Sequence, residues 1–194
     1  MKPIAISILT VCGIPELVEH EARQVTHVLS ILDPEEPEPA ALVRFAPHHR
    51  TTLRFHDAIE PGPDVILPEA SHVAEILLFG RDLAASAAGR QEGHLLVHCH
   101  AGISRSTAAL TMLLAQVYPE QSADNLLSRV LDMRAKAWPN LRMMEFADEQ
   151  LGRDGELVRA AGRIYRHQVE IRSHIADFMR QHRRGREVDL AERS

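Results

Sequence analysis

The chain has 194 residues, of which 45% are hydrophobic and 25% are charged, and its formal net charge at pH 7 is −5. These values are ordinary for a soluble globular protein, and the length suits one compact domain with a full hydrophobic core. The negative charge argues against general nucleic-acid binding, which needs a positive surface to displace counterions. No stretch reaches the roughly 20 consecutive apolar residues that would span a bilayer.

The first part of the chain predicts alternating strands and helices. Residues 4–11 form an apolar run that predicts a first strand; a single Lys precedes it and no small-residue cleavage site follows, so it does not match a signal peptide. Residues 15–23 begin with Pro and favour a short helix, and residues 26–32 predict a second strand. Residues 33–39 form a proline-broken acidic loop that is too short to link two domains.

A third strand and a helix lead to the middle of the chain. Residues 51–56 alternate Thr, Leu and Phe with Thr, Arg and His, and they predict a strand that ends at Asp57. Pro68 and Ser71 then open a helix with apolar residues on one face, and an apolar strand over residues 95–99 follows it. This order favours an α/β fold, a single domain with a central, mostly parallel sheet flanked by helices.

The strand over residues 95–99 continues into a loop suited to binding a phosphate group. Cys99 ends the strand, five residues follow, and Arg105 precedes an apolar run over residues 108–117 that predicts a buried helix. Five residues are enough to wrap backbone N–H groups around one tetrahedral anion, and Gly102 permits a turn that is closed to most residues. The loop therefore lies at the N-terminus of a helix, where the helix dipole favours negative charge.

The residue types at this loop fit nucleophilic chemistry on a phosphate. Thiol pKa values fall at helix N-termini and beside cations, so we expect Cys99 to be a thiolate at rest. The planar fork of Arg105 can hold two phosphoryl oxygens and follow them into a trigonal-bipyramidal transition state. Ser106 can donate its hydroxyl to the sulfur and make it a better leaving group. A buried structural Cys would explain the strand but would leave the Gly and Arg spacing to coincidence.

At these residues the sequence resembles the Cys-based protein tyrosine phosphatase superfamily, and its short dual-specificity branch in particular. The signature His-Cys-x-x-Gly-x-x-Arg-Ser matches at every fixed position from His98 to Ser106, and two further positions match common choices. The resemblance implies a phosphate-binding loop that comprises His98, His100, Ala101, Gly102, Ile103 and Ser104.

The resemblance also implies a role for each reactive residue. Cys99 is the implied nucleophile, and Arg105 is implied to bind the phosphoryl group. Ser106 is implied to assist hydrolysis of the phosphocysteine, and His98 to brace the loop by hydrogen bonding.

A general acid is needed as well, because the leaving alkoxide or phenolate must be protonated as the P–O bond breaks. In the family this Asp follows the strand that precedes the helix before the nucleophile strand, and Asp57 occupies that place. Asp64 is the rival: it lies in the same loop and closer to Cys99 in sequence, but it can equally be a surface turn residue. We expect Asp57 to be the acid and then, once ionised, to activate water against the phosphocysteine.

Beyond the loop the chain predicts helices only. Ser122 caps one helix, and Pro139-Asn140 begins another that runs to Leu151. A last helix over residues 156–180 carries an apolar stripe, and residues 182–186 are interpreted as a frayed polar end.

The apolar stripe bears on domain organisation and oligomeric state. We assign residues 1–151 to a phosphatase-like catalytic domain and residues 152–194 to a helical extension packed on it. If the stripe instead meets a second copy, the protein is a homodimer joined through this helix, and otherwise it is a monomer.

The chain holds two cysteines and 12 histidines. Cys12 follows the first strand, where low-molecular-weight phosphatases place their loop, but Val18 stands where that loop would need its Arg, which excludes Cys12 as an equivalent nucleophile. With Cys99 required as a free thiol, no disulfide framework can form, which indicates a reducing, cytoplasmic setting. The histidines lack the spacing of a recognised metal site, and a metal on Cys99 would quench it, so we expect no metal and no cofactor.

The expected function is metal-independent hydrolysis of phosphomonoesters through a phosphocysteine intermediate. Phosphotyrosine proteins are the first expected substrates, with phosphoserine and phosphothreonine proteins admitted, and no nucleic acid or membrane partner is expected. Phosphoinositide and RNA 5′-phosphate phosphatases share the signature and are alternatives, although residues 100–104 contain no Lys to bind an inositol headgroup. A non-catalytic phosphate-binding or sulfur-transfer module is a more remote alternative.

Overall fold

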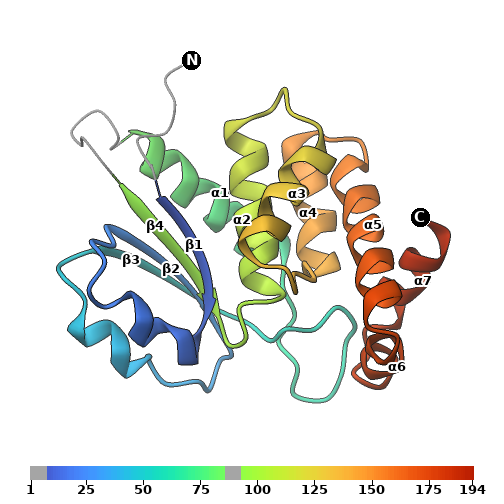
Figure 1. The fold of residues 1–194 in the computed structure, drawn as a ribbon, viewed down its shortest axis with the longest axis horizontal. Helices are drawn as coiled ribbons and strands as arrows, with labels where there is room; N and C mark the ends of the chain where they lie inside the picture. The colour runs from blue at the N-terminus through green and yellow to red at the C-terminus, as the bar shows by residue number, and fades with distance from the viewer. Residues whose placement is uncertain (1–7, 86–92) are drawn as a thin grey trace.

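A computed structural model of the chain describes residues 8–85 and 93–194 (Figure 1). Its sheet contains four strands, β1 (Ile8–Gly13), β2 (His27–Leu32), β3 (His49–Arg54) and β4 (His94–Cys99). The strand order is β1-β4-β2-β3, and every neighbouring pair is parallel. The predicted α/β fold with a mostly parallel sheet is confirmed. Of the predicted first strand, residues 4–7 lie outside the described residues.

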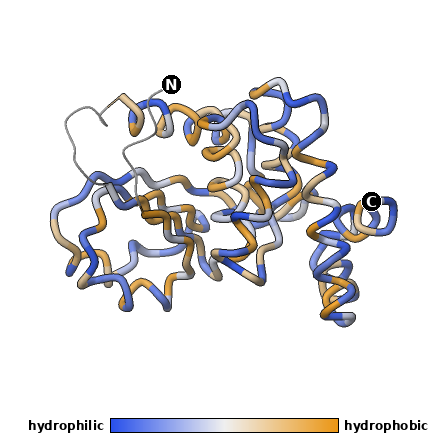
Figure 2. Tube along the Cα trace, turned by 45° about the horizontal axis from the view of Figure 1, so that its top comes forward, coloured by the Kyte–Doolittle hydropathy of each residue, from blue (hydrophilic) through white to orange (hydrophobic). Residues whose placement is uncertain are grey.

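The two central strands carry the hydrophobic core on both faces of the sheet. Every residue of β2 and β4 is buried, as expected for parallel strands that are covered on both sides. Alternate side chains point to opposite faces, so the core divides into two clusters. Figure 2 shows hydrophobic segments gathered along these strands and the helices beside them. Because β4 is central, the loop that follows it lies in the middle of the sheet's carboxyl edge.

Different helices cover the two faces. One face packs against 3₁₀-helices Ile14–His20 and Ala40–Arg44, which contribute Leu17 and Leu42 to the smaller cluster. The other face meets a larger helical layer, drawn beside the sheet in Figure 1. That layer contains α1 (Ala70–Ala85), α2 (Arg105–Val117), α3 (Ala123–Met133), α4 (Leu141–Leu151), α5 (Glu156–Ile171), α6 (His174–Gln181) and α7 (Gly185–Arg193).

Two predicted helix starts are confirmed by their capping bonds. The Asn125 backbone N–H donates to Ser122 Oγ at 3.3 Å, and the Met143 backbone N–H donates to Asn140 Oδ1 at 3.2 Å. Short polar side chains at these positions satisfy backbone donors that a helix leaves free at its N-terminus.

The third strand is displaced from its predicted bounds. The alternating pattern predicts residues 51–56, but β3 spans His49–Arg54. Its partner β2 ends at Leu32, which pairs with Arg54, so β3 has no strand residue to pair with beyond Arg54. The Phe55 backbone N–H still donates to the Leu32 carbonyl at 3.0 Å. This bond fixes where the chain leaves the sheet, two residues before Asp57.

The predicted single helix over residues 156–180 is wrong, because the chain breaks it between α5 and α6. Arg172 leaves the helix with φ −142°, and α6 begins at His174. No Gly or Pro marks the break. Instead the buried Gln168 side chain donates to the Ala135 carbonyl at 2.8 Å, which ties the end of α5 to the body, and Met179 on α6 becomes buried. Tertiary contacts override the local helical pattern here.

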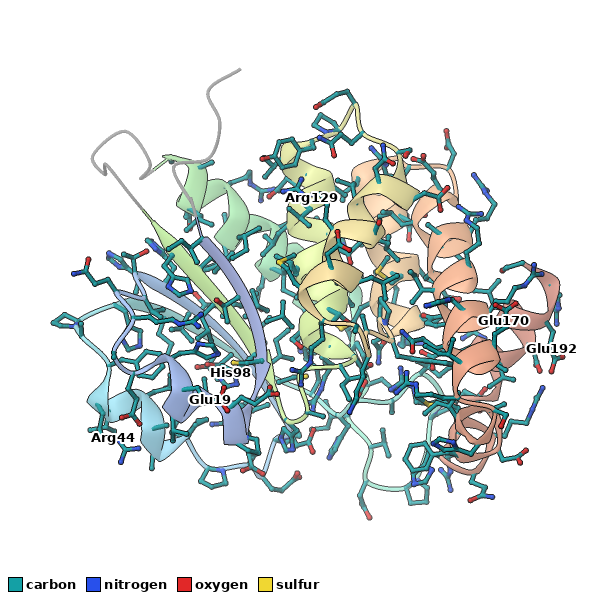
Figure 3. The ribbon with its side chains drawn as sticks, in the orientation of Figure 1. Glu19, Arg44, His98, Arg129, Glu170 and Glu192 are labelled. Carbon is teal, nitrogen blue, oxygen red and sulfur yellow. The ribbon has the colours of Figure 1, made fainter. Side chains whose placement is uncertain are left out.

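The prediction of a frayed polar end over residues 182–186 is also wrong. Arg184 is buried, and α7 follows directly with Glu187, Val188 and Ala191 buried. Arg184 can be buried because its charge meets the carboxylates of Asp57 and Glu187 inside the protein. α5 packs against α3, α4 and α7, and the labelled Glu170 and Glu192 lie on the outer side of this layer in Figure 3. The domain boundary at residue 151 and the oligomeric state stay predictions.

No helix in the described ranges, 8–85 and 93–194, is long and apolar enough to cross a membrane.

Candidate active site

The 99–105 loop lies between the end of β4 and the start of α2. Gly102 takes φ +68°, and a Cβ atom there would lie 2.4 Å from the Cys12 carbonyl carbon. Both the left-handed backbone and the close approach of β1 require glycine at this position. The loop therefore holds its shape against the neighbouring strand.

Cys99 and Ser106 face each other across this loop. Cys99 is 2% exposed, and its Sγ lies 3.2 Å from Ser106 Oγ, within reach of a hydrogen bond. The hydroxyl is thus placed to donate to a thiolate. The roles of nucleophile and leaving-group assistant stay predictions that this geometry permits.

Arg105 lies under the loop with part of its guanidinium group unused. Its side chain is 2% exposed, and Nη1 donates to Asp33 Oδ1 at 2.6 Å and to the Phe55 carbonyl at 2.5 Å. Its buried Nε has no hydrogen-bond partner among the described residues. A buried donor without a partner costs free energy, and an anion bound at the loop would satisfy it.

His98 joins two strands of the sheet, and its role in bracing the loop stays a prediction. It is fully buried on β4, in the region labelled in Figure 3, and its Nε2 shares a 2.7 Å hydrogen bond with Ser30 Oγ on β2. Burial, reinforced by the Arg50 charge, lowers the pKa of His98 to about 4. The imidazole is therefore neutral at physiological pH, and it adds no positive charge behind Cys99.

One cleft of about 670 Å³ brings the reactive residues together. Cys99, Arg105 and Asp57 line it, together with four predicted residues of the loop: His100, Ala101, Ile103 and Ser104. His98, Gly102 and Ser106 are buried beside it. Asp64 is exposed at a turn with φ +55° and is not among the lining residues. Of the two candidate acids, only Asp57 shares the cleft with Cys99.

The carboxylate of Asp57 is held by three neighbours. Ser104 Oγ and Asn140 Nδ2 donate to its Oδ1 at 2.7 and 2.9 Å, and Arg184 Nη1 lies 3.2 Å from its Oδ2. Burial acts to raise the pKa of Asp57, but the charges of Arg184 and Arg105 and the hydrogen bonds from Asn140 and Ser104 together outweigh burial, so the net shift is downward. In the absence of substrate Asp57 is therefore an anion at neutral pH.

Sequence reasoning missed three polar contributors to the cleft. Asp33 comes from the loop after β2 and contacts Arg105. Asn140 was expected only as a helix start, yet its amide also binds Asp57. Arg184 comes from the segment expected to be frayed. The one local signal for the last is the i, i+3 spacing of Arg184 and Glu187, which suits an ion pair.

Helix α6 also supplies a wall of the cleft. Ile175, Phe178 and Met179 of α6 line it, with Arg172 and His182 at the two ends of that helix. Phe178 is 48% exposed and stacks on His182 with ring centroids 4.0 Å apart. An apolar surface therefore faces the 99–105 loop across the cleft.

The second cysteine lies on the other face of the sheet. Cys12 belongs to the smaller core cluster and Cys99 to the larger one, and both are free thiols. Burial, with a contribution from Glu16, raises the pKa of Cys12 to about 12. Cys12 is therefore an unreactive thiol that packs behind the loop. No group of three His, Cys, Asp or Glu residues in the described part of the chain is arranged to hold a metal ion.

The fold has counterparts among solved structures. The chain aligns with human DUSP28 at 18% identity and a TM-score of 0.55, covering 75% of this chain and 92% of that one. It aligns with DUSP15 at 22% identity and a TM-score of 0.54, covering 83% and 94%. A human tyrosine phosphatase-like serine/threonine/tyrosine-interacting protein matches at 17% identity and a TM-score of 0.56, covering 77% and 95%.

These likenesses define the fold as that of the dual-specificity branch of Cys-based tyrosine phosphatases, which confirms the resemblance at the level of the fold. No protein-family model and no curated protein sequence matches the chain.

We expect Glu187→Ala to lower the free energy of unfolding by about 3–5 kcal/mol, because the change breaks a buried ion pair and leaves several buried donors without their acceptor. Glu187 is 0% exposed and accepts hydrogen bonds from Arg184, Trp138 and the Leu141 backbone N–H. Urea denaturation followed by circular dichroism measures the effect.

The matched control for this prediction is Glu145→Ala, which removes the partly exposed pair with Arg186 between α4 and α7. Surface pairs contribute about 0–1 kcal/mol. A Glu187→Ala variant no less stable than Glu145→Ala would contradict the buried network.

Proposed function

We propose that the protein hydrolyses phosphomonoesters through a phosphocysteine intermediate. The observation that carries the proposal is the cleft that Cys99, Asp57 and Arg105 line together, with a buried Arg105 Nε that no group of the described residues binds. A thiol nucleophile, an anion-binding donor and a carboxyl group are the three groups that this reaction requires.

In the first step Cys99 Sγ attacks phosphorus in line with the leaving oxygen. The S–P bond forms while the P–O bond breaks, and the proton of Asp57 passes to the departing oxygen. Arg105 and the backbone N–H groups of the 99–105 loop stabilise the charge on the equatorial oxygens.

In the second step water attacks the phosphocysteine. Asp57, now a carboxylate, accepts a proton from the water as the new P–O bond forms. The S–P bond breaks, and Ser106, 3.2 Å from Sγ, donates a hydrogen bond to the departing thiolate. Inorganic phosphate and the starting enzyme result, so the cycle needs no cofactor and no metal. Because Cys99 must stay a free thiol, we place the enzyme in a reducing, cytoplasmic compartment.

Phosphotyrosine in proteins is the proposed substrate, with phosphothreonine and phosphoserine also accepted. The apolar wall of Ile175, Phe178 and Met179 supports an aromatic substrate, because it offers a surface on which a phenyl ring can pack. Two carboxylates beside His100 count against a highly charged inositol headgroup, because carboxylate oxygens of Asp33 and Glu36 lie 3.7 and 3.8 Å from His100 Nε2.

The test is a panel of matched phosphopeptides, soluble phosphoinositides and 5′-phosphorylated RNA, compared by kcat/KM. We expect phosphotyrosine peptides to rank first, with weaker but measurable hydrolysis of phosphothreonine peptides. Phe178→Ala should reduce the ratio of kcat/KM for phosphotyrosine peptides to kcat/KM for phosphothreonine peptides, because the phenyl ring of the substrate loses part of the surface on which it packs. A phosphoinositide or RNA end that ranks above every phosphopeptide would overturn the choice of substrate and leave the Cys99 chemistry standing.

A further inference from the structure

Every nitrogen of the Arg184 guanidinium group has a partner in or beside the active site. Its Nε and Nη2 donate to Glu187 Oε2 and Oε1, both at 2.7 Å, and Nη2 also donates to Ser104 Oγ at 2.9 Å. Its Nη1 lies 3.2 Å from Asp57 Oδ2. All three guanidinium nitrogens thus have partners, and two of those partners belong to the site described above. A solvated surface arginine makes no such set of contacts.

Glu187 fixes this guanidinium group from behind. It receives a hydrogen bond from Trp138 Nε1 at 2.6 Å and one from the Leu141 backbone N–H at 3.0 Å. Trp138 stacks on Tyr165 of α5 with ring centroids 4.7 Å apart, and its backbone N–H donates to the Ile103 carbonyl at 2.9 Å. The network therefore runs from α5 and α7 to the 99–105 loop without a gap.

We propose that Arg184 is a positioning residue for the acid step: it holds the Asp57 carboxyl group over the 99–105 loop and stabilises the carboxylate that forms when the proton leaves. The proposal rests on the proposed function of Asp57. The proposal gives the segment from α6 to α7 a place in the active site, because this segment supplies Arg184, which contacts Asp57.

The chemistry follows from the charge that develops on Asp57. When the proton passes to the leaving oxygen, a negative charge appears at Oδ1 and Oδ2. A cation already in place stabilises that charge without reorganisation at the moment of reaction. Asp57 thereby becomes a stronger acid, at the cost of a smaller protonated fraction at neutral pH.

Other groups face Asp57 and bear on its titration. Arg105 acts in the same direction as Arg184, and the neutral donors Ser104 and Asn140 also favour the carboxylate. Glu187 offsets part of the Arg184 charge, and burial opposes all of these effects. Removing the Arg184 charge therefore raises the pKa of Asp57.

The experiment compares Arg184→Met and Arg184→Lys with the wild type on two substrates, phenyl phosphate and p-nitrophenyl phosphate, over a range of pH. Phenolate is the poorer leaving group and needs the proton more. The double variant Arg184→Met with Glu187→Gln removes both buried charges, so it keeps the test valid if Arg184→Met alone does not fold. Arg186→Met, which removes an exposed arginine of α7, is the matched control.

At a pH low enough to protonate Asp57 in both proteins, we expect Arg184→Met to lower kcat/KM for phenyl phosphate on the order of 10²-fold, the loss that a small misplacement of a catalytic group causes. The loss for p-nitrophenyl phosphate should be much smaller. The basic limb of the pH profile should move to higher pH, because the pKa of Asp57 rises. Arg184→Lys keeps the charge without the planar fork, so it should retain the wild-type limb and recover part of the rate. Arg186→Met should match the wild type.

Equal losses on both substrates with an unmoved pH limb would overturn the proposal and leave Arg184 a purely structural role. Full activity of the folded Arg184→Met variant on phenyl phosphate would overturn it as well. If the wild type hydrolyses neither substrate, the proposed function itself fails, and the assignment of Arg184 fails with it. The wild-type arm therefore separates the two failures.

Discussion

Cys99→Ser is expected to abolish hydrolysis of an aryl phosphate while leaving the fold and phosphate binding largely intact. A serine hydroxyl is a far weaker nucleophile than a thiolate, so no covalent intermediate forms. The loop amides and the buried Nε of Arg105 remain, so the variant should still bind inorganic phosphate. Steady-state hydrolysis of p-nitrophenyl phosphate measures the first effect, and isothermal titration with phosphate measures the second.

The other cysteine provides the matched control for Cys99→Ser. Cys12→Ala changes a buried thiol on the opposite face of the sheet and should retain turnover. Vanadate should inhibit the wild type and EDTA should not. Substantial activity in Cys99→Ser, or loss of wild-type activity on chelation, would contradict the mechanism. If the protein only binds phosphate, neither the wild type nor Cys99→Ser will show turnover.

The sequence predicts the 99–105 loop because its parts are contiguous. A buried strand, a five-residue turn and a helix N-terminus are local features, and Gly102 marks the one left-handed residue between them. Asp57 is predicted from the family resemblance, which implies an acid in the loop after the strand that precedes α1. Asp57 and Asp64 both lie in that loop, so the choice of the residue that faces the cleft needed the coordinates.

The sequence could not predict that the C-terminal segment contributes Arg184 to the active site. Arg184 and Ser104 are 80 residues apart in the chain, and nothing in the composition of either segment announces the contact. A cluster of Arg and Glu predicts a solvated end, because buried charges are rare unless they are paired. The pairs that permit burial, with Asp57 and Glu187, exist only after α5 and α7 have packed on the body. The break at Arg172 is hidden for the same reason.

Asp57→Asn is expected to reduce the rate on poor leaving groups by roughly 10²–10⁴-fold, the usual contribution of a general acid. The penalty should grow with the pKa of the leaving alcohol, which a series of substituted phenyl phosphates measures.

The active form of wild-type Asp57 is the protonated one, and Arg184 and Arg105 lower its pKa. Above that pKa the protonated fraction falls roughly tenfold per pH unit. Activity on phenyl phosphate should therefore decline from acidic toward neutral pH in the wild type, and Asp57→Asn should lack that decline. Asp64→Asn, at the exposed turn, is the matched control and should keep the wild-type profile. If only Asp64→Asn removes the pH limb and the leaving-group dependence, the assignment of the acid to Asp57 is wrong.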